Sequence, residues 1–192
     1  MIYKHPFEFL SNPAQRRAFL ALLILSSLLM GAMALLDRQL KTTAAPFGIV
    51  SFELARTQTN SQEMLQSWGP QGQIYAALSI GLDYLYLFSY SSTISLGCVF
   101  VAQRVAKRTN VFSLAGVLLA WSQGAAALLD AIENYALIRL LLGADQELWP
   151  TLAWWCAVPK FAIIASGLVY LVAGGVVISK ISNSDQKDIL SQ

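Results

Sequence analysis

The chain has 192 residues, of which 56% are hydrophobic and 12% charged, and its formal net charge is +2. Soluble domains carry about 25% charged residues, so this composition excludes an ordinary water-soluble domain and indicates a protein with the lipid bilayer as its solvent. The single histidine, His5, and two cysteines without a CxxC motif exclude an imidazole-built haem or zinc site and dithiol redox chemistry. We expect no metal, no cofactor and no nucleic-acid partner.

Four apolar stretches are long enough to cross a membrane, which takes about 20 residues of helix. We predict an all-α integral membrane protein, a four-helix transmembrane bundle forming a single membrane domain over residues 1–192. The last three helices continue beyond the apolar windows that define them, and the third would be about 50 Å long. The predicted spans are 18–36, 73–103, 109–142 and 149–179.

The connection between the first two spans, residues 37–72, is predicted to be an outer loop that caps the bundle. It contains a short amphipathic helix near 61–68, with Asn60 or Ser61 as the N-cap and a Gly-Pro pair after its end. The apolar face of this helix fits either the membrane interface or the bundle. The segment 46–55 is compatible with an extended or a helical structure.

Basic residues predict the orientation of the helices. Eight of the thirteen Lys and Arg residues fall on the side that holds both termini and the short link after the second span, which indicates that both termini are cytoplasmic. A bacterial inner membrane fits this arrangement. The residues on this side are Lys4, Arg16, Arg17, Arg104, Lys107, Arg108, Lys180 and Lys187.

Charged residues recur at one depth near the outer edge of the hydrocarbon. Asp83, Asp130 and Lys160 each lie about 20 residues along their helix from a basic residue at the inner side. Glu133 and Asn134 follow Asp130 at i+3 and i+4, on the same helix face. Ionisable groups at membrane depth usually face the bundle interior and pair there. These residues therefore predict a polar layer with an excess of carboxylates, which favours a cation, a proton or a basic ligand.

The second span is also rich in hydroxyl groups. Asp83, Tyr86 and Tyr90 share one helix face, and serines and a threonine follow. The serines fit helix packing and back-bonding to the helix, or a polar path leading inward from the layer. The candidate ligand-binding residues are Asp83, Asp130, Glu133, Asn134, Lys160, Tyr86 and Tyr90.

Small residues recur along the third span at Gly116, Ala120 and Gly124, which predicts a seam for a neighbouring helix or for a homo- or hetero-oligomer. Cys98 and Cys156 are predicted at depths too different for a disulfide, so we expect two free thiols.

Three functions remain open at this point. The first is binding or transport of a small amphipathic or cationic ligand, or a lipid, in an outer-leaflet polar pocket. The second is a small membrane enzyme that acts on a lipid, with Glu133 or Asp130 as general base and Lys160 as electrostatic stabiliser. The third is a structural subunit or assembly factor of a membrane complex. We expect binding rather than catalysis, because the sequence names no positioned nucleophile.

Overall fold

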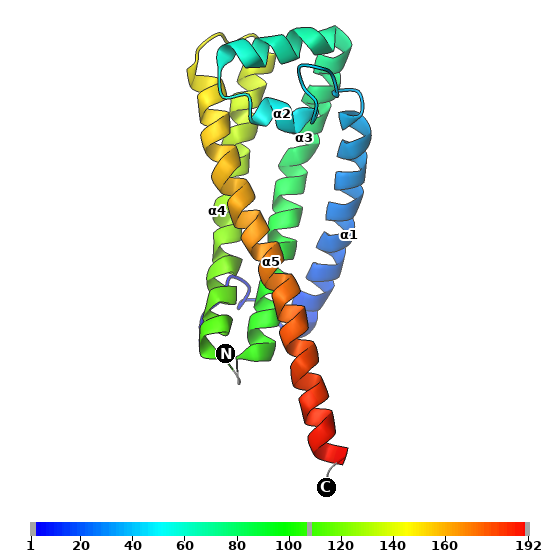
Figure 1. Ribbon diagram of the computed structural model, residues 1–192, viewed down its shortest axis with the longest axis vertical. Coiled ribbons are helices and arrows are strands. Elements are labelled where there is room, and N and C mark those ends of the chain that lie inside the picture. The colour runs from blue at the N-terminus through cyan, green and yellow to red at the C-terminus, as the bar shows by residue number, and fades with distance from the viewer. Residues whose placement is uncertain (1–2, 107–108, 191–192) are drawn as a thin grey trace.

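A computed structural model describes residues 3–106 and 109–190, with side chains up to residue 180. These residues form helices and connecting loops and no strand (Figure 1). Four helices are long and apolar enough to cross a membrane, which confirms the predicted all-α four-helix membrane fold. The helices are α1 (Asn12–Asp37), α2 (Ile49–Glu53), α3 (Gln58–Val105), α4 (Asn110–Leu141) and α5 (Leu148–Leu190).

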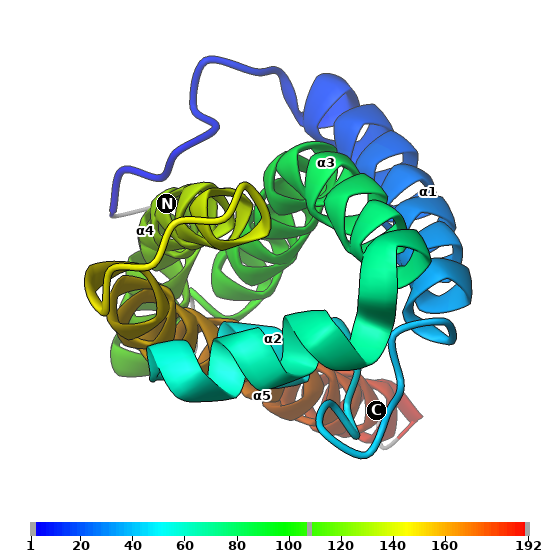
Figure 2. The same ribbon diagram turned by 90° about the horizontal axis from the view of Figure 1, so that it is seen from above.

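Helices α3, α4 and α5 pack against one another, and α1 lies along the outside of α3 (Figure 2). One face of α1 is covered by α3, while large apolar side chains such as Leu20, Ile24 and Leu28 remain exposed. An exposed apolar face of this kind suits contact with lipid tails. We call the end at the α1–α2 loop the outer end and the end at the α3–α4 link the inner end. These names keep the predicted orientation; Lys107, Arg108 and the side chain of Lys187, which were used for it, lie outside the described residues.

Helix α3 changes direction at Gly69. This residue has φ 59° and ψ −175°, a backbone conformation that side chains disfavour, and Pro70 follows it at the start of the long membrane segment. The preceding residues, 58–68, form an arm that lies across the outer end of the bundle (Figure 1). The predicted amphipathic helix is therefore present, and the Gly-Pro pair separates it from the span.

The arm docks on the bundle through its apolar face. The Trp68 ring packs edge-on against Phe52 of α2, and the Trp68 Nε1–H donates a 2.7 Å hydrogen bond to the carbonyl oxygen of Leu40. Leu137 and Leu140 of α4 complete this buried outer core. Of the two predicted positions for the apolar face, the structure shows the bundle.

The arm is capped by a residue other than those predicted. Thr57 is extended, and its Oγ1 accepts a hydrogen bond from the Asn60 amide. The Ser61 hydroxyl instead donates to the Thr57 carbonyl, and Asn60 Nδ2 donates to the carbonyl of Ala55. The prediction of Asn60 or Ser61 as N-cap is therefore wrong, because the helix begins earlier and both side chains bond back to the preceding turn.

The small-residue seam of α4 is used inside the chain. The Tyr170 ring of α5 lies directly on Gly116, and Ala120 is buried. Gly124 has open space at its Cβ position. Gly116 and Ala120 are thus occupied by α3 and α5, and the predicted oligomer contact through all three residues stays a prediction. Cys98 and Cys156 are both free and buried, as predicted.

Candidate functional site

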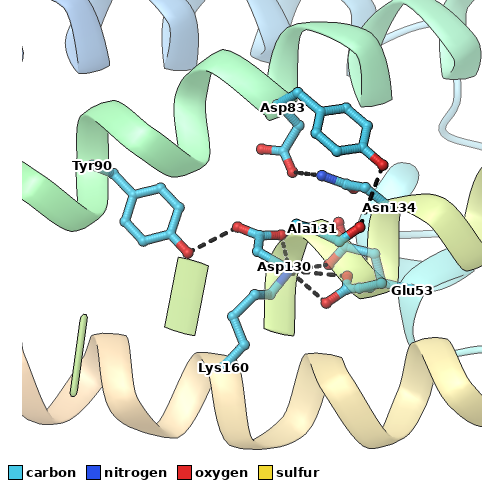
Figure 3. A network of polar contacts seen from close by, with 9 residues as sticks. Glu53, Asp83, Tyr90, Asp130, Ala131, Asn134 and Lys160 are labelled. Carbon is cyan, nitrogen blue, oxygen red and sulfur yellow. Dashed lines mark hydrogen bonds and ion pairs between the residues drawn. The ribbon is translucent and has the colours of Figure 1, made fainter. Parts of the chain in front are cut away.

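The centre of the polar layer is the Lys160 ammonium group on α5, which is surrounded by carboxyl groups (Figure 3). Its Nζ lies 3.0 Å from Asp130 Oδ1 and 2.9 Å from Glu133 Oε1, and it donates a hydrogen bond to each. Glu133 Oε2 is 2.8 Å away as a further ion-pair contact, and Glu53 Oε2 is 3.7 Å away. Lys160 therefore meets three carboxyl groups from two elements.

Two further hydrogen bonds extend the layer onto α3. The Tyr90 hydroxyl donates to Asp130 Oδ2 at 2.8 Å, and Asn134 Nδ2 donates to Asp83 Oδ2 at 2.7 Å (Figure 3). Tyr86 packs against Tyr90 with ring centroids 5.0 Å apart. The structure thus brings together all seven predicted residues.

Regular helix geometry explains this convergence. Asp130, Glu133 and Asn134 occupy one face of α4, at spacings of three and four residues. Their exposed fractions are 2%, 0% and 2%, so this face is fully enclosed by α3, α5 and α2. An isolated charge there would be costly, and each charged group of this face has a partner from another helix.

Glu53 is the member of the layer that sequence reasoning missed. It is the last residue of the short helix α2, which lies beneath the arm between the long helices (Figure 2). Phe52 beside it is completely buried and anchors α2 in the outer core. The signal available in the sequence was one acidic residue inside an otherwise apolar stretch, 46–55, whose conformation was ambiguous.

The layer holds more acid than base. Four carboxyl groups, those of Asp83, Asp130, Glu133 and Glu53, share the single amine of Lys160 among the side chains the structure describes here. Burial raises the pKa of Glu53 above its ordinary value, and the nearby Lys160 opposes this without reversing it. Complete ionisation would leave uncompensated negative charge in a region with little water, which is strongly disfavoured.

Two buried carboxyl oxygens in the layer lack a hydrogen bond of regular geometry. Glu53 Oε2 has no hydrogen-bond partner and lies 3.7 Å from Lys160 Nζ, whereas Glu133 Oε2 is held by its ion pair with Lys160 at 2.8 Å. Two ionised carboxylates that share one lysine repel each other, and a proton bound by one of them removes that repulsion. The pair is therefore the part of the layer that is incompletely served by protein donors.

The free space beside the layer is small. A cavity of about 10 Å³ opens between α1, α2 and α3, and Met33, Glu53, Ser79, Asp83 and Asn134 are among its lining residues. About 10–15 Å³ is the minimum that holds one water molecule. The carboxyl groups of Glu53 and Asp83 both border this cavity.

Most hydroxyl groups below the layer bond to backbone carbonyls. Ser89, Ser91 and Thr93 donate to carbonyls of their own helix, and Ser95 donates across to Ala120 of α4 at 2.7 Å. A separate cavity of about 160 Å³ on this face is lined by Ser91, Ser92 and Ser95 and bordered by Phe7 of the N-terminal segment. These contacts favour the packing interpretation of the serines.

Arg139 of α4 lies outside the layer. Its guanidinium lies 5.0 Å from the ring centroid of Trp149, in a cation–π contact at the outer end of α4. Six residues separate it from Glu133, which places it almost two turns outward.

No protein-family model matches the sequence, and no curated protein or solved structure matches it significantly. In the described part of the chain, no group of three or more His, Cys, Asp or Glu side chains is arranged to hold a metal ion.

Proposed function

We propose that this multi-pass membrane protein binds a proton in its outer polar layer, and that the proton is held by the Glu53–Glu133 carboxyl pair beside Lys160. The observation that carries the proposal is the buried Glu53 Oε2, which has no hydrogen-bond partner in a layer where several carboxyl groups surround one lysine. Lys160 compensates part of the negative charge, and one bound proton removes a further unit. The layer would then respond to the pH of the outer compartment.

The size of the cavity supports a proton over larger ligands. About 10 Å³ beside Glu53 and Asp83 accommodates one water molecule, which can deliver a proton, and is too small for an amphipathic molecule. The same small volume argues against the hypothesis of a lipid-modifying enzyme, because a lipid substrate would need space next to Glu133. The alternative explanation of the layer is a purely structural ion-pair network that binds no ligand.

The test is a thermal unfolding series over pH, in detergent, on the wild type and Glu53→Gln. A carboxyl group whose pKa is raised by folding stabilises the fold fully below its unfolded pKa, about 4.3, and this contribution is lost as pH rises through the folded value. We expect the melting temperature of the wild type to fall as the pH rises from about 4.3 through the folded pKa of this carboxyl group. The Glu53→Gln variant, whose neutral amide mimics a protonated carboxyl, should show a flatter profile.

Infrared spectroscopy measures the same proton directly. The wild type at neutral pH should show the carbonyl band of a protonated carboxyl group that Glu53→Gln removes. Glu63→Gln, which changes an exposed carboxylate of the arm, is the matched control and should preserve both the band and the pH profile. Identical profiles and spectra for wild type and Glu53→Gln would leave the structural network as the better assignment. If sodium specifically stabilised the protein at high pH, the ligand of this site would instead be a metal cation.

A further inference from the structure

A third cavity lies at the opposite end of the molecule from the polar layer, between α1 and α3. Its volume is about 420 Å³, and it is lined by Asn12, Arg16, Phe100, Gln103 and Arg104. Sites for small organic ligands have volumes of about 300–1,000 Å³. This cavity is therefore large enough for a polar headgroup, unlike the space beside Glu53.

The chemistry of the lining favours an anion. Arg16 and Arg104 contribute guanidinium groups from two different helices, and Asn12 and Gln103 add amide donors. Guanidinium groups bind phosphate through paired N–H donors. The cavity thus offers two such groups at one opening, and both arginine side chains are exposed and accessible.

The start of α1 adds to the positive potential. Asn12 is the first residue of this helix, its first turn contains no acidic residue, and the preceding Ser11 makes no side-chain cap. The free N–H groups of a first turn and the helix dipole both favour a negative ligand. The nearby Glu8 carboxylate accepts a hydrogen bond from the His5 amide.

The surroundings of the cavity are apolar on the side facing the membrane. The Phe100 ring packs edge-on against Phe19 of α1 with centroids 5.5 Å apart. Further along the same helix, Leu20 and Ile24 are about 60% exposed. A ligand with a phosphate group and hydrocarbon chains would meet arginines at its head and exposed leucine and isoleucine side chains along its tails.

We propose that the α1–α3 cavity binds the phosphate-bearing headgroup of an anionic membrane lipid, with Arg16 and Arg104 as the phosphate ligands. Basic pockets between membrane helices at the cytoplasmic side bind anionic headgroups in this way. The proposal is independent of the proton site, because it involves the other end of the bundle and a different set of residues. The bound lipid would also tie α1 to the rest of the bundle.

The experiment is native mass spectrometry of the whole protein, titrated with phosphatidylglycerol and with phosphatidylcholine of the same chain length. We expect a preference for the anionic lipid. Each arginine near a phosphate contributes about a fivefold affinity, so Arg16→Gln/Arg104→Gln should weaken phosphatidylglycerol binding about thirtyfold. Replacement of both arginines by lysine should retain most of the binding, since the charge stays.

The matched control is Arg17→Gln/Arg38→Gln, which removes the same charge from an exposed position of α1 and from the exposed residue that follows α1, both outside the cavity. It should bind phosphatidylglycerol like the wild type. Equal weakening in both double variants, or none in either, would overturn the proposal. A further arm uses inorganic phosphate alone: competition with the lipid at millimolar phosphate would support the same anion site with a soluble ligand as its source.

Discussion

The two ends of the bundle handle charge in opposite ways. At the outer end, Lys160 and its carboxyl partners are enclosed by three long helices, α2 and the arm, with almost no free space. At the inner end, Arg16 and Arg104 are exposed beside a cavity of about 420 Å³. Enclosed charges need partners within the chain, whereas exposed charges remain available for partners from outside. The comparison teaches that the enclosed end leaves space for about one water molecule, whereas the open end has a cavity of about 420 Å³.

Lys160→Met gives the largest expected effect and tests the enclosed end. It leaves Asp130 and Glu133 buried without their cation, which should lower the free energy of unfolding by about 3–5 kcal/mol. Thermal unfolding in detergent measures this loss. Lys180→Met, near the inner end of the same helix and exposed, should change stability by less than about 0.5 kcal/mol.

An additional variant separates charge burial from lost packing. Lys160→Met combined with Asp130→Asn and Glu133→Gln should recover part of the stability, because the uncompensated carboxylates are gone. Equal stability of Lys160→Met and the wild type would mean that the layer is hydrated, and the contrast between the two ends would disappear.

Gly116→Ala tests the tight contact between α4 and α5. The added methyl group collides with the Tyr170 hydroxyl, which also donates a 3.0 Å hydrogen bond to the Phe112 carbonyl. Overpacking of this kind costs about 1–3 kcal/mol. Gly124→Ala on the same helix meets open space and should be tolerated. Tyr170→Phe in the Gly116→Ala background should relieve only the part of the clash made by the hydroxyl, because two carbons of the ring also lie within 2.8 Å of the added methyl group. A Gly124→Ala variant that loses as much stability as Gly116→Ala would contradict this cause.

Trp68→Phe tests how firmly the arm closes the outer end. The phenyl ring keeps most of the contact with Phe52 but removes the donor to the buried Leu40 carbonyl. An unsatisfied buried carbonyl costs about 1–2 kcal/mol. Trp155→Phe, which changes an exposed tryptophan, is the control for chemical denaturation. Equal stability of both variants would show that the arm is held by apolar contact alone.

The smallest effect concerns His5 at the inner end. Its Nδ1 accepts a 3.2 Å hydrogen bond from the Phe7 amide, so the ring is neutral, and burial lowers its pKa below 6.5 although Glu8 opposes this. A lowered pKa contributes stability above the unfolded value that is lost as pH falls through the folded one. The protection factor of the Phe7 amide against hydrogen exchange should therefore fall as the pH drops below the unfolded histidine value of about 6.5. The Leu10 amide, bonded to the Phe7 carbonyl, should respond less.

The regular part of the molecule was accessible from sequence, and its irregular part was not. Asp83, Asp130 and Lys160 were placed at one depth because a helix rises by a constant amount per residue. Glu53 was missed because it belongs to the short helix α2 in the connection between α1 and α3, whose position depends on docking rather than on periodicity. The same reason explains the wrong N-cap, since Thr57 owes its role to where the chain from α2 enters the arm.

The contact between Glu53 and Lys160 has a consequence for how the chain assembles in the membrane. Helix α2 is synthesised long before α5, at about 5–20 residues per second. The Glu53 carboxyl group therefore lacks its Lys160 partner until α5 has been inserted and Lys160 has reached the same depth. Closure of the outer end must then be a late step of biogenesis, which follows the insertion of α5 rather than the order of the sequence.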